Sequence, residues 1–458
     1  MSRQLVIIFN FLCGAFKRKI SLGNLDTHQF MSENRRLGTF SLAALLVSAH
    51  YGLGFLLGTA EQALTLDAAG SLYAISIGLG TIALLALAKF YWQEVEQIWT
   101  LLGKRYGASV KILVGLMSWF SLIGIEAVQI IAGAFILKVL GAPVLPSMVG
   151  LATLFMIISL LPVEKASWIF QSLLLLNFLA LIYGLWALHG LPDYWHSSLE
   201  FIPSLAQIDP PNLVGISLST ILLVLIDMKY QQFVVQAKDL RSLYQGCLLA
   251  AIVLLLLALL PSSVVIAAKH AGILPSGIDG KETIPFILSW IGGGIHQPVG
   301  MLLIMSLIVP ALGVGSSILR VQTKTILDFD ILPVSQKNRL LIAATNAFFG
   351  LAVALKGGSI INLIASFYAV YVAAVLVPFI AYLLAKAGYY IFSDLSVKLS
   401  LIIGSMSALT TLILTLILPN VAVFGSTELT IMMMGVGFGV LGLLVGQWSL
   451  GYDKLPQS

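Results

Sequence analysis

Two places in the sequence put ionisable side chains inside long apolar stretches, where such groups are costly and commonly functional. His50 stands among glycines, and an imidazole titrates near physiological pH. It could bind a polar ligand or carry a proton, or it could bond to backbone carbonyls that the glycines free. Glu126 and Gln129 are three residues apart and so share one face of a helix. The carboxyl could carry a proton or hold a cationic group, or stay neutral against a neighbouring helix. The Gln129 amide favours polar packing.

Two further groups lie toward the ends of apolar stretches. Asp227 and Lys229 indicate a gate or a structural ion pair more than a ligand contact. Ser316 and Ser317 follow a glycine-rich segment. Their hydroxyls could bind a cation, or they could only pack closely against another helix, as small residues in membranes often do.

The composition sets the surroundings of these groups. The chain has 458 residues, of which 59% are hydrophobic and 10% charged, whereas soluble domains carry roughly 25% charged residues. A mean hydropathy of +0.99 excludes a soluble globular protein, a disordered chain and a secreted disulfide scaffold. The two cysteines, Cys13 and Cys247, give neither a disulfide framework nor a cysteine-based metal site. The sequence therefore predicts a membrane protein with many spans, and it gives no indication of nucleic-acid binding.

Apolar runs of the length of a membrane helix, about 20 residues, recur along the whole chain. They show no strand-like alternation of the kind found in β-barrels, so we expect an all-α integral membrane protein with about twelve transmembrane helices. The segment 5–16 is short for a span and precedes basic residues, which indicates a membrane-associated or truncated helix and not a cleaved signal peptide. The predicted runs are 38–60, 68–91, 109–138, 144–163, 166–190, 211–236, 243–268, 296–321, 339–355, 359–385, 399–418 and 429–450.

The distribution of Lys and Arg predicts how the chain is oriented. Placing the start of the first long run in the cytoplasm puts most basic residues in inner loops, in accordance with the positive-inside rule. The segment 191–210, acidic and aromatic, is then the longest outer loop. We therefore expect a multi-pass protein of the plasma (inner) membrane, with both ends of the helical body cytoplasmic.

No enzyme signature competes with this interpretation. The sequence lacks a P-loop, a nucleophile elbow and the His/Glu spacing of a metalloprotease, and its histidines stand singly. We therefore expect no enzymatic activity, no cofactor and no metal centre.

Four segments of the chain stand out together. They are GNLDTHQFMSENRRLGTFSLAALLVSAHYGLGFLLGTAEQA with its RLG element at 36–38, AVQIIAGAFILKVLGAP at 127–143, DMKYQQFVVQAKDLRSLYQGCLLA at 227–250 and NLIASFYAVYVAAVLVPFIAYLLAKAG at 362–388. Taken together, these segments resemble a known family, the sodium:solute symporters of the APC superfamily. The resemblance covers nearly the whole chain.

The resemblance implies a LeuT-type fold, in which two sets of five helices form an inverted repeat. A ten-helix transporter core would occupy 38–388, preceded by a cytoplasmic or membrane-associated segment at 1–37. Two peripheral helices and a short cytoplasmic tail would occupy 389–458. The first and sixth core helices would be interrupted, as such helices are at transporter binding sites. The glycine-rich first run fits this expectation, whereas the sixth lacks an internal Gly/Pro pair.

The family's sodium site is altered in this sequence. The resemblance places the site's alanine at Ala311 but its two hydroxyl positions at Val314 and Gly315, next to Ser316 and Ser317. A Thr-Asp pair associated with a second cation site in some members falls on Ser167 and Trp168. Sodium needs several oxygen ligands, by the logic that governs other hard cations, so coupling to protons is the alternative.

These observations predict a secondary active transporter of a small polar or organic solute that works by alternating access. The rival hypothesis is a transporter-like membrane sensor or assembly subunit without transport activity. Tyr368 and Tyr371 could line the site or only pack at an interface. The predicted solute-binding residues are His50, Tyr51, Gly52, Glu126, Gln129, Ser217, Tyr368 and Tyr371. The predicted ion-binding residues, for Na+ or H+, are Ser48, Tyr51, Ala311, Ser316 and Ser317, and the predicted gate is Asp227 with Lys229. The sequence leaves the solute and the oligomeric state open.

Overall fold

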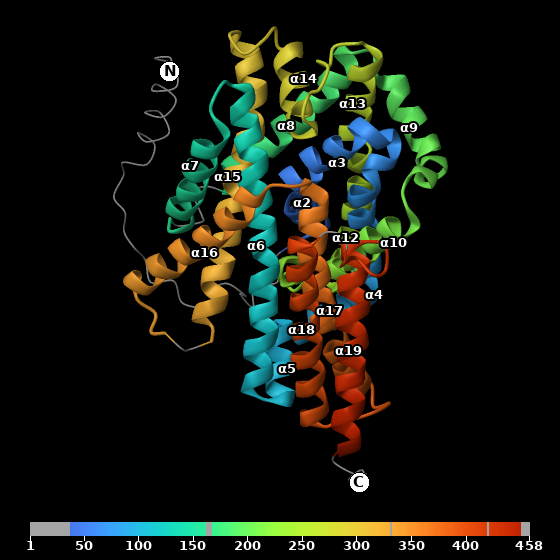
Figure 1. Ribbon diagram of the computed structural model, residues 1–458, viewed down its shortest axis with the longest axis vertical. Helices are drawn as coiled ribbons and strands as arrows, with labels where there is room; N and C mark the ends of the chain where they lie inside the picture. The colour runs from blue at the N-terminus through green and yellow to red at the C-terminus, as the bar shows by residue number, and fades with distance from the viewer. Residues whose placement is uncertain (1–36, 162–166, 330–331, 419–420, 450–458) are drawn as a thin grey trace.

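The computed structural model describes residues 37–161, 167–329, 332–418 and 421–449, and within them the side chains of 167–174 and 228–229 are not described. The predicted short helix at 5–16, with Cys13, lies outside these ranges. The described chain is helical, with an isolated parallel β-bridge between Leu37 and Ala237 (Figure 1). Its helices are α2 (Thr39–His50), α3 (Leu53–Leu66), α4 (Leu72–Glu94), α5 (Ile98–Tyr106), α6 (Ala108–Val139), α7 (Val144–Ser159), α8 (Ser167–Ala187), α9 (Leu191–Ser204), α10 (Pro210–Ile226), α11 (Met228–Val234), α12 (Leu240–Ala258), α13 (Leu260–His270), α14 (Thr283–Ile291), α15 (Pro298–Leu327), α16 (Gln336–Lys356), α17 (Ile360–Lys386), α18 (Asp394–Ile417) and α19 (Thr427–Ser449).

Every predicted apolar run contains a helix or a pair of helices. Eight helical stretches of the described chain are long and apolar enough to cross a membrane, and the bent pair α8–α9 makes a ninth if it is one span. One of the eight, Leu53–Glu94, is interrupted at Asp67, whose positive φ of 47° separates α3 from α4. The remaining runs hold the shorter apolar helices α2, α7 and α10. The all-α membrane fold predicted from composition is confirmed.

The first predicted helix is broken where its glycines stand. α2 ends at His50 and α3 begins at Leu53, with Gly52 in an extended conformation between them. The N–H of Tyr51 donates to the Val47 carbonyl at 2.8 Å, which closes the last turn of α2. Glycine tolerates such a break because it has no side chain to clash, and the break opens backbone in the middle of the protein.

The sixth predicted helix is also broken, although no glycine or proline marks the position. α10 ends at Ile226, Asp227 is extended with ψ of 130°, and α11 begins at Met228. The Tyr91 hydroxyl donates to the Leu225 carbonyl at 2.6 Å, and the Tyr371 hydroxyl donates to the Ile226 carbonyl at 3.1 Å. Backbone groups freed inside a membrane protein need such partners, so tyrosines from α4 and α17 stabilise the break.

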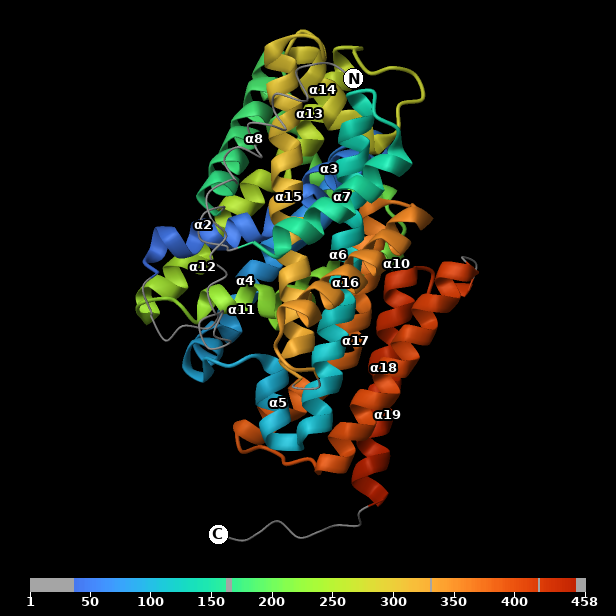
Figure 2. The same ribbon diagram turned by 90° about the vertical axis from the view of Figure 1, so that its left-hand side faces the viewer.

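The two broken helices meet in the middle of a bundle. α11 packs against α2, and α4, α6, α15 and α17 surround the two breaks. α18 and α19 form a hairpin against α17, and α16 lies across α6 and α7 (Figures 1 and 2). One end of the molecule carries α14 and the far end of α6, and the opposite end carries α5 (Figure 2). We call these the α14 end and the α5 end.

Three helices were not expected from the sequence. α5 and α14 are short, with nine residues each. The predicted outer loop at 191–210 instead contains α9, which bends away from α8 by 102°. Its apolar residues Leu191, Trp195 and Leu199 recur every four residues and are all exposed, which is the pattern of an amphipathic helix.

Candidate binding site between the broken helices

A small cavity lies where the two breaks meet. It is lined by Ala49, His50, Gly52, Gly54 and Phe55 of the first broken helix, Tyr73 and Ile77 of α4, Ile125 and Gln129 of α6, Tyr230 of α11, Val314 of α15, and Ile364 and Tyr368 of α17. The centre of a water molecule can occupy about 20 Å³ of it, which is enough for about one water. The site as it stands in this structure therefore has no room for a solute much larger than water.

His50 and Tyr230 join the two broken helices through their rings. The ring centroids are 3.9 Å apart and the planes are inclined by 20°, so the rings are stacked. His50 Nε2 lies 3.4 Å from Thr81 Oγ1, and that hydroxyl donates to the Ile77 carbonyl. Because a threonine has a single hydroxyl hydrogen, Nε2 acts as the donor in this contact whenever the Thr81 hydroxyl donates to Ile77.

Gln129 is the amide in the cavity wall. Its side chain is 2% exposed, and its Oε1 accepts no hydrogen bond from any described residue. The amide faces Gly52, where an added Cβ would lie 3.8 Å from Nε2. A buried acceptor without a partner costs about 1–3 kcal/mol, so the wall offers a place for a hydrogen-bond donor.

The structure brings only some of the predicted solute-binding residues together. His50, Gly52, Gln129 and Tyr368 line the cavity, and Tyr51, Glu126, Ser217 and Tyr371 do not. The Tyr51 hydroxyl lies 3.5 Å from Asn177 Oδ1 of α8, and Ser217 lies 3.4 Å from Ser76 of α4.

Glu126 points away from the cavity toward α15 and α16. It is fully buried, and a Cβ on Gly350 of α16 would lie 2.5 Å from its carboxyl carbon. When the Gln322 amide is oriented so that both its oxygen and its nitrogen form hydrogen bonds, its nitrogen donates to Glu126 Oε2 at 3.1 Å. The other carboxylate oxygen, Glu126 Oε1, has no hydrogen-bond partner among the described residues. Elsewhere on α16, Asn346 accepts from Trp119 of α6 at 3.0 Å and donates to Thr323 of α15 at 3.4 Å. Glu126 and Gln129 thus belong to two different sites.

The predicted ion-binding residues do not converge. On α15, Ser316 is buried and donates to the Gly313 carbonyl at 3.3 Å, whereas Ser317 is exposed and donates to the Val314 carbonyl. Ala311 is buried, and Ser48 donates to the Leu45 carbonyl within α2. Val314 is the α15 residue that reaches the cavity. The side chains of Ser167 and Trp168 lie outside the described ones.

The predicted gate residue Asp227 lies at the break between α10 and α11 and not toward the end of a continuous helix. Its side chain is 4% exposed. The side chain of its expected partner, Lys229, lies outside the described ones.

The protein is closed on the α5 side of the cavity by backbone pairing. Leu37 receives a hydrogen bond from Lys238 N at 3.0 Å and donates one to Gln236 O at 3.0 Å, so the start of α2 is paired with the segment after α11. The Trp92 indole donates to the Ala237 carbonyl at 2.8 Å from the end of α4. Lys386 of α17 pairs with Glu94 nearby.

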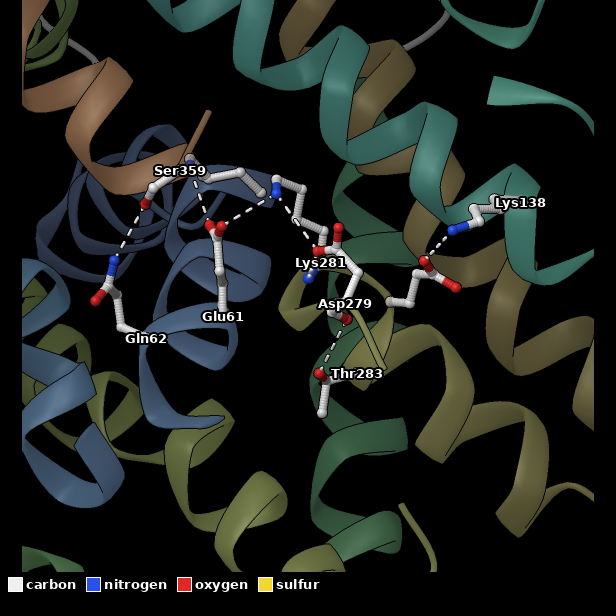
Figure 3. A network of polar contacts seen from close by, with 9 residues as sticks. Glu61, Gln62, Lys138, Asp279, Lys281, Thr283 and Ser359 are labelled. Atoms are coloured by element: carbon white, nitrogen blue, oxygen red, sulfur yellow. Dashed lines mark hydrogen bonds and ion pairs between the residues drawn. The ribbon is translucent and has the colours of Figure 1, made fainter. Parts of the chain in front are cut away.

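The opposite side is closed by charged side chains (Figure 3). Glu61 of α3 accepts from the Ile360 N–H, the first residue of α17, at 2.8 Å, and pairs with Lys281 at 3.2 Å. Lys281 lies in the 3₁₀ turn Gly280–Glu282 before α14, where it also contacts Asp279 at 3.4 Å. We call Glu61, Lys281, Asp279 and the Ile360 N–H the ionic closure.

Two contacts flank the ionic closure. Gln62 donates to Ser359 at 3.1 Å, and Lys138 at the end of α6 pairs with Glu282 at 2.5 Å (Figure 3). A Cβ on Gly280 would lie 2.9 Å from the Glu61 Cα. The turn before α14 therefore packs directly on α3 and ties α3, α6 and α17 together above the cavity.

Sequence reasoning missed most of the aromatic lining. Phe55, Tyr73 and Tyr230 belong to the cavity but have no distinctive spacing among the many aromatic residues of the chain. Tyr230 carried the clearest signal, since it lies one turn after Asp227. No group of three or more His, Cys, Asp or Glu residues within the described ranges is placed to hold a metal ion.

No protein-family model and no curated protein matches the chain. The solved structures that resemble it over nearly its whole length include two transporters with the same overall architecture. A Na+-coupled sialic acid symporter, in a substrate-bound outward-open state, aligns with a TM-score of 0.64 at 13% identity and covers 99% of this chain and 98% of that chain. MHP1, a nucleobase-cation-symport-1 family transporter, in a closed conformation with bromovinylhydantoin bound, aligns with a TM-score of 0.54 at 12% identity and covers 93% of this chain and 96% of that chain. Likeness at this level of identity establishes a shared fold.

Proposed function

We propose that this protein, which has the LeuT-type fold, is a secondary active transporter that moves a small solute across the membrane by alternating access. The likeness to the two solved transporters confirms the LeuT-type fold predicted from the sequence. Membership of the sodium:solute symporter family stays a prediction. One observation carries the proposal. Two broken helices meet at a cavity inside the protein, and two separate sets of contacts close this cavity, one on each side. Broken helices around a mid-membrane site are the construction expected of a transporter.

The two closures suggest how access alternates. Releasing the ionic closure would free α3 and the turn before α14 from α17, and would open the cavity toward the α14 end. Releasing the pairing of Leu37 with Gln236 and Lys238 would open it toward the α5 end. Because both closures are formed in this structure, it corresponds to an occluded state. The positive-inside rule assigns the α5 end to the cytoplasm and the α14 end to the outside.

The family resemblance implies Na+ as the coupling ion, whereas the arrangement of side chains around the cavity supports H+. Ser316 is buried and Ser317 is exposed, so their hydroxyls cannot converge on one cation without a local rearrangement of α15. The α15 residue at the cavity is Val314, whose side chain offers no oxygen. His50 is an ionisable group of the cavity wall, and imidazole exchanges protons near neutral pH. We therefore propose a proton carried by His50 as the coupling ion.

Uptake into proteoliposomes tests both parts of the proposal. Labelled solutes would be offered with an imposed Na+ gradient or an imposed proton gradient, each alone. Accumulation under the proton gradient, lost in His50→Gln, is the expected result. Accumulation under the Na+ gradient that Ser316→Ala removes and Ser317→Ala preserves would refute proton coupling and assign Na+ to α15. Purified protein that accumulates no solute under either gradient would favour the sensor or assembly subunit.

A further inference from the structure

The helix α9 carries an apolar surface that the rest of the described chain leaves exposed. Four large apolar side chains form it, with exposed fractions of 48%, 68%, 76% and 70%. At 3.6 residues per turn they fall within roughly 80° of one another around the helix. Such a grouping is a continuous face and not a scatter of single exposed residues, so it points to a partner. We call its residues the apolar stripe of α9: Leu191, Trp195, Leu199 and Ile202.

The opposite sides of α9 are fixed against the protein. Phe201 is buried with Leu72 of α4 in a small apolar cluster. The Tyr194 hydroxyl donates to the Leu256 carbonyl of α12 at 2.8 Å. Figure 1 shows α9 at the edge of the molecule, beside α13. Because these contacts hold the helix in one orientation, the apolar stripe points outward, away from the bundle.

The apolar stripe continues the exposed apolar surface of α8, a helix of the membrane bundle. Leu179, Tyr183 and Trp186 recur every three or four residues along α8, and all three are exposed. Directly after Trp186 the chain bends by 102° into α9. A bend close to a right angle turns a chain that crosses the bilayer into one that lies along its surface. Trp186 and Trp195, on either side of the bend, are of the residue type that gathers at membrane–water interfaces.

The charges of α9 indicate which lipid surface fits it. Leu191–Ser204 contains no Lys or Arg, the residues through which interfacial helices attract anionic lipids. Its charged side chains, Asp193 and Glu200, line a polar cleft of about 340 Å³ together with His196. Asp193 pairs there with His270 of α13 at 3.0 Å. Burial of apolar surface, and not attraction between charges, is therefore the force that would hold α9 to a membrane.

These observations identify the partner of the apolar stripe. We propose that α9 is an interfacial helix, which lies in the headgroup layer of the outer leaflet and inserts the apolar stripe among the acyl chains of lipids without net charge. The leaflet follows from the orientation assigned above by the positive-inside rule. This placement rests on the surface of α9 and does not depend on the proposed transport activity.

Spin labels on single cysteines test the placement in the full chain. Cys13 and Cys247 would be replaced by serine, and the protein would be reconstituted into vesicles of phosphatidylcholine. A label at Leu199→Cys reports on the apolar stripe, and a label at Glu200→Cys, the next residue, reports on the polar side of the same helix. Oxygen is apolar and concentrates among acyl chains, whereas a water-soluble nickel chelate stays outside them. Collision rates with the two reagents therefore distinguish lipid from water.

We expect the ratio of oxygen to nickel accessibility to be several-fold higher at Leu199→Cys than at Glu200→Cys. Leu179→Cys on α8 is the reference for a side chain in lipid, and its ratio should equal or exceed that at Leu199→Cys. Leu199 is 76% exposed, so its replacement removes little packing and should leave folding unchanged.

Two other results would overturn the proposal. Equally low ratios at Leu199→Cys and Glu200→Cys would place the apolar stripe in water. Low collision rates with both reagents at Leu199→Cys would place it against protein, and spin–spin broadening would then identify a second copy of the chain. Failure of the transport proposal would look different, because no solute would then accumulate in proteoliposomes, whatever the labels on α9 report.

Discussion

Replacing Glu61 with glutamine should weaken the ionic closure without removing its hydrogen-bond acceptor. In the wild type, the carboxylate accepts from Ile360 N at 2.8 Å and pairs with Lys281 at 3.2 Å, and the two side chains are only 14% and 13% exposed. An amide oxygen can still accept from Ile360 N, but it loses the ion pair. A hydrogen bond to a charged group contributes about 1.5–3 kcal/mol, so the open population at the α14 end should rise roughly 10- to 150-fold.

Thiol accessibility measures this population. Tyr73 lines the cavity, and a Tyr73→Cys reporter would be introduced into a chain whose Cys13 and Cys247 are replaced by serine. A membrane-impermeant maleimide added to the α14 side of oriented proteoliposomes reacts only when that side is open. We expect Glu61→Gln to raise the labelling rate by roughly the factor given by the lost ion pair.

A matched control separates the closure from general loosening of that end. Glu282→Gln removes the neighbouring pair with Lys138, whose side chain is 45% exposed, and exposed pairs contribute at most about 1 kcal/mol. Labelling should therefore rise much less in Glu282→Gln than in Glu61→Gln. Equal labelling of the wild type and Glu61→Gln, with unchanged Tm, would refute the assignment of Glu61 to a closure.

Three further predictions concern the breaks and the polar cluster. Gly350→Val places a Cβ 2.5 Å from the Glu126 carboxyl carbon and should lower stability by about 1–3 kcal/mol, seen in thermal unfolding; an unchanged Tm would contradict the packing described. Tyr371→Phe removes the donor to the Ile226 carbonyl and should cost about 1 kcal/mol by the same measurement, unlike an exposed control such as Tyr389→Phe. His50→Phe retains a ring against Tyr230 but cannot titrate, so downhill uptake without an imposed proton gradient should lose its pH dependence; a preserved pH profile would exclude His50 as the proton carrier.

The two breaks show what a sequence can and cannot reveal about such a fold. The break at Gly52 is predictable because glycine removes the local steric barrier to leaving the helix. The break at Asp227 depends on Tyr91 and Tyr371, which satisfy the freed carbonyls from helices distant in the sequence. No local pattern encodes those partners. A break supported by tertiary contacts therefore has to be found in the structure.

The contrast between Glu126 and Gln129 has a similar cause. Residues three apart lie on the same side of a helix but are rotated by about 60° from each other at 3.6 residues per turn. Because α6 is buried around most of its circumference, that rotation is enough to direct Gln129 to the cavity and Glu126 to α16. Helical spacing alone thus predicts a shared side and not a shared site. The aromatic residues of the cavity could not be predicted from the sequence for a related reason, because membrane helices carry aromatic residues on all their faces.

The two closures differ in chemistry, and this difference bears on how the proposed cycle proceeds. At the α5 end, the start of α2 is paired through backbone hydrogen bonds with the segment after α11. This pairing joins α2, which is half of the first broken helix, to α11, which is half of the second. We therefore expect α2 and α11 to move together. At the α14 end, α3 is held to α17 by side chains of the ionic closure, which can exchange their partners for water. The halves of the first broken helix are therefore bound to different neighbours, and the flexible Tyr51–Gly52 link lets either half move while the other stays in place.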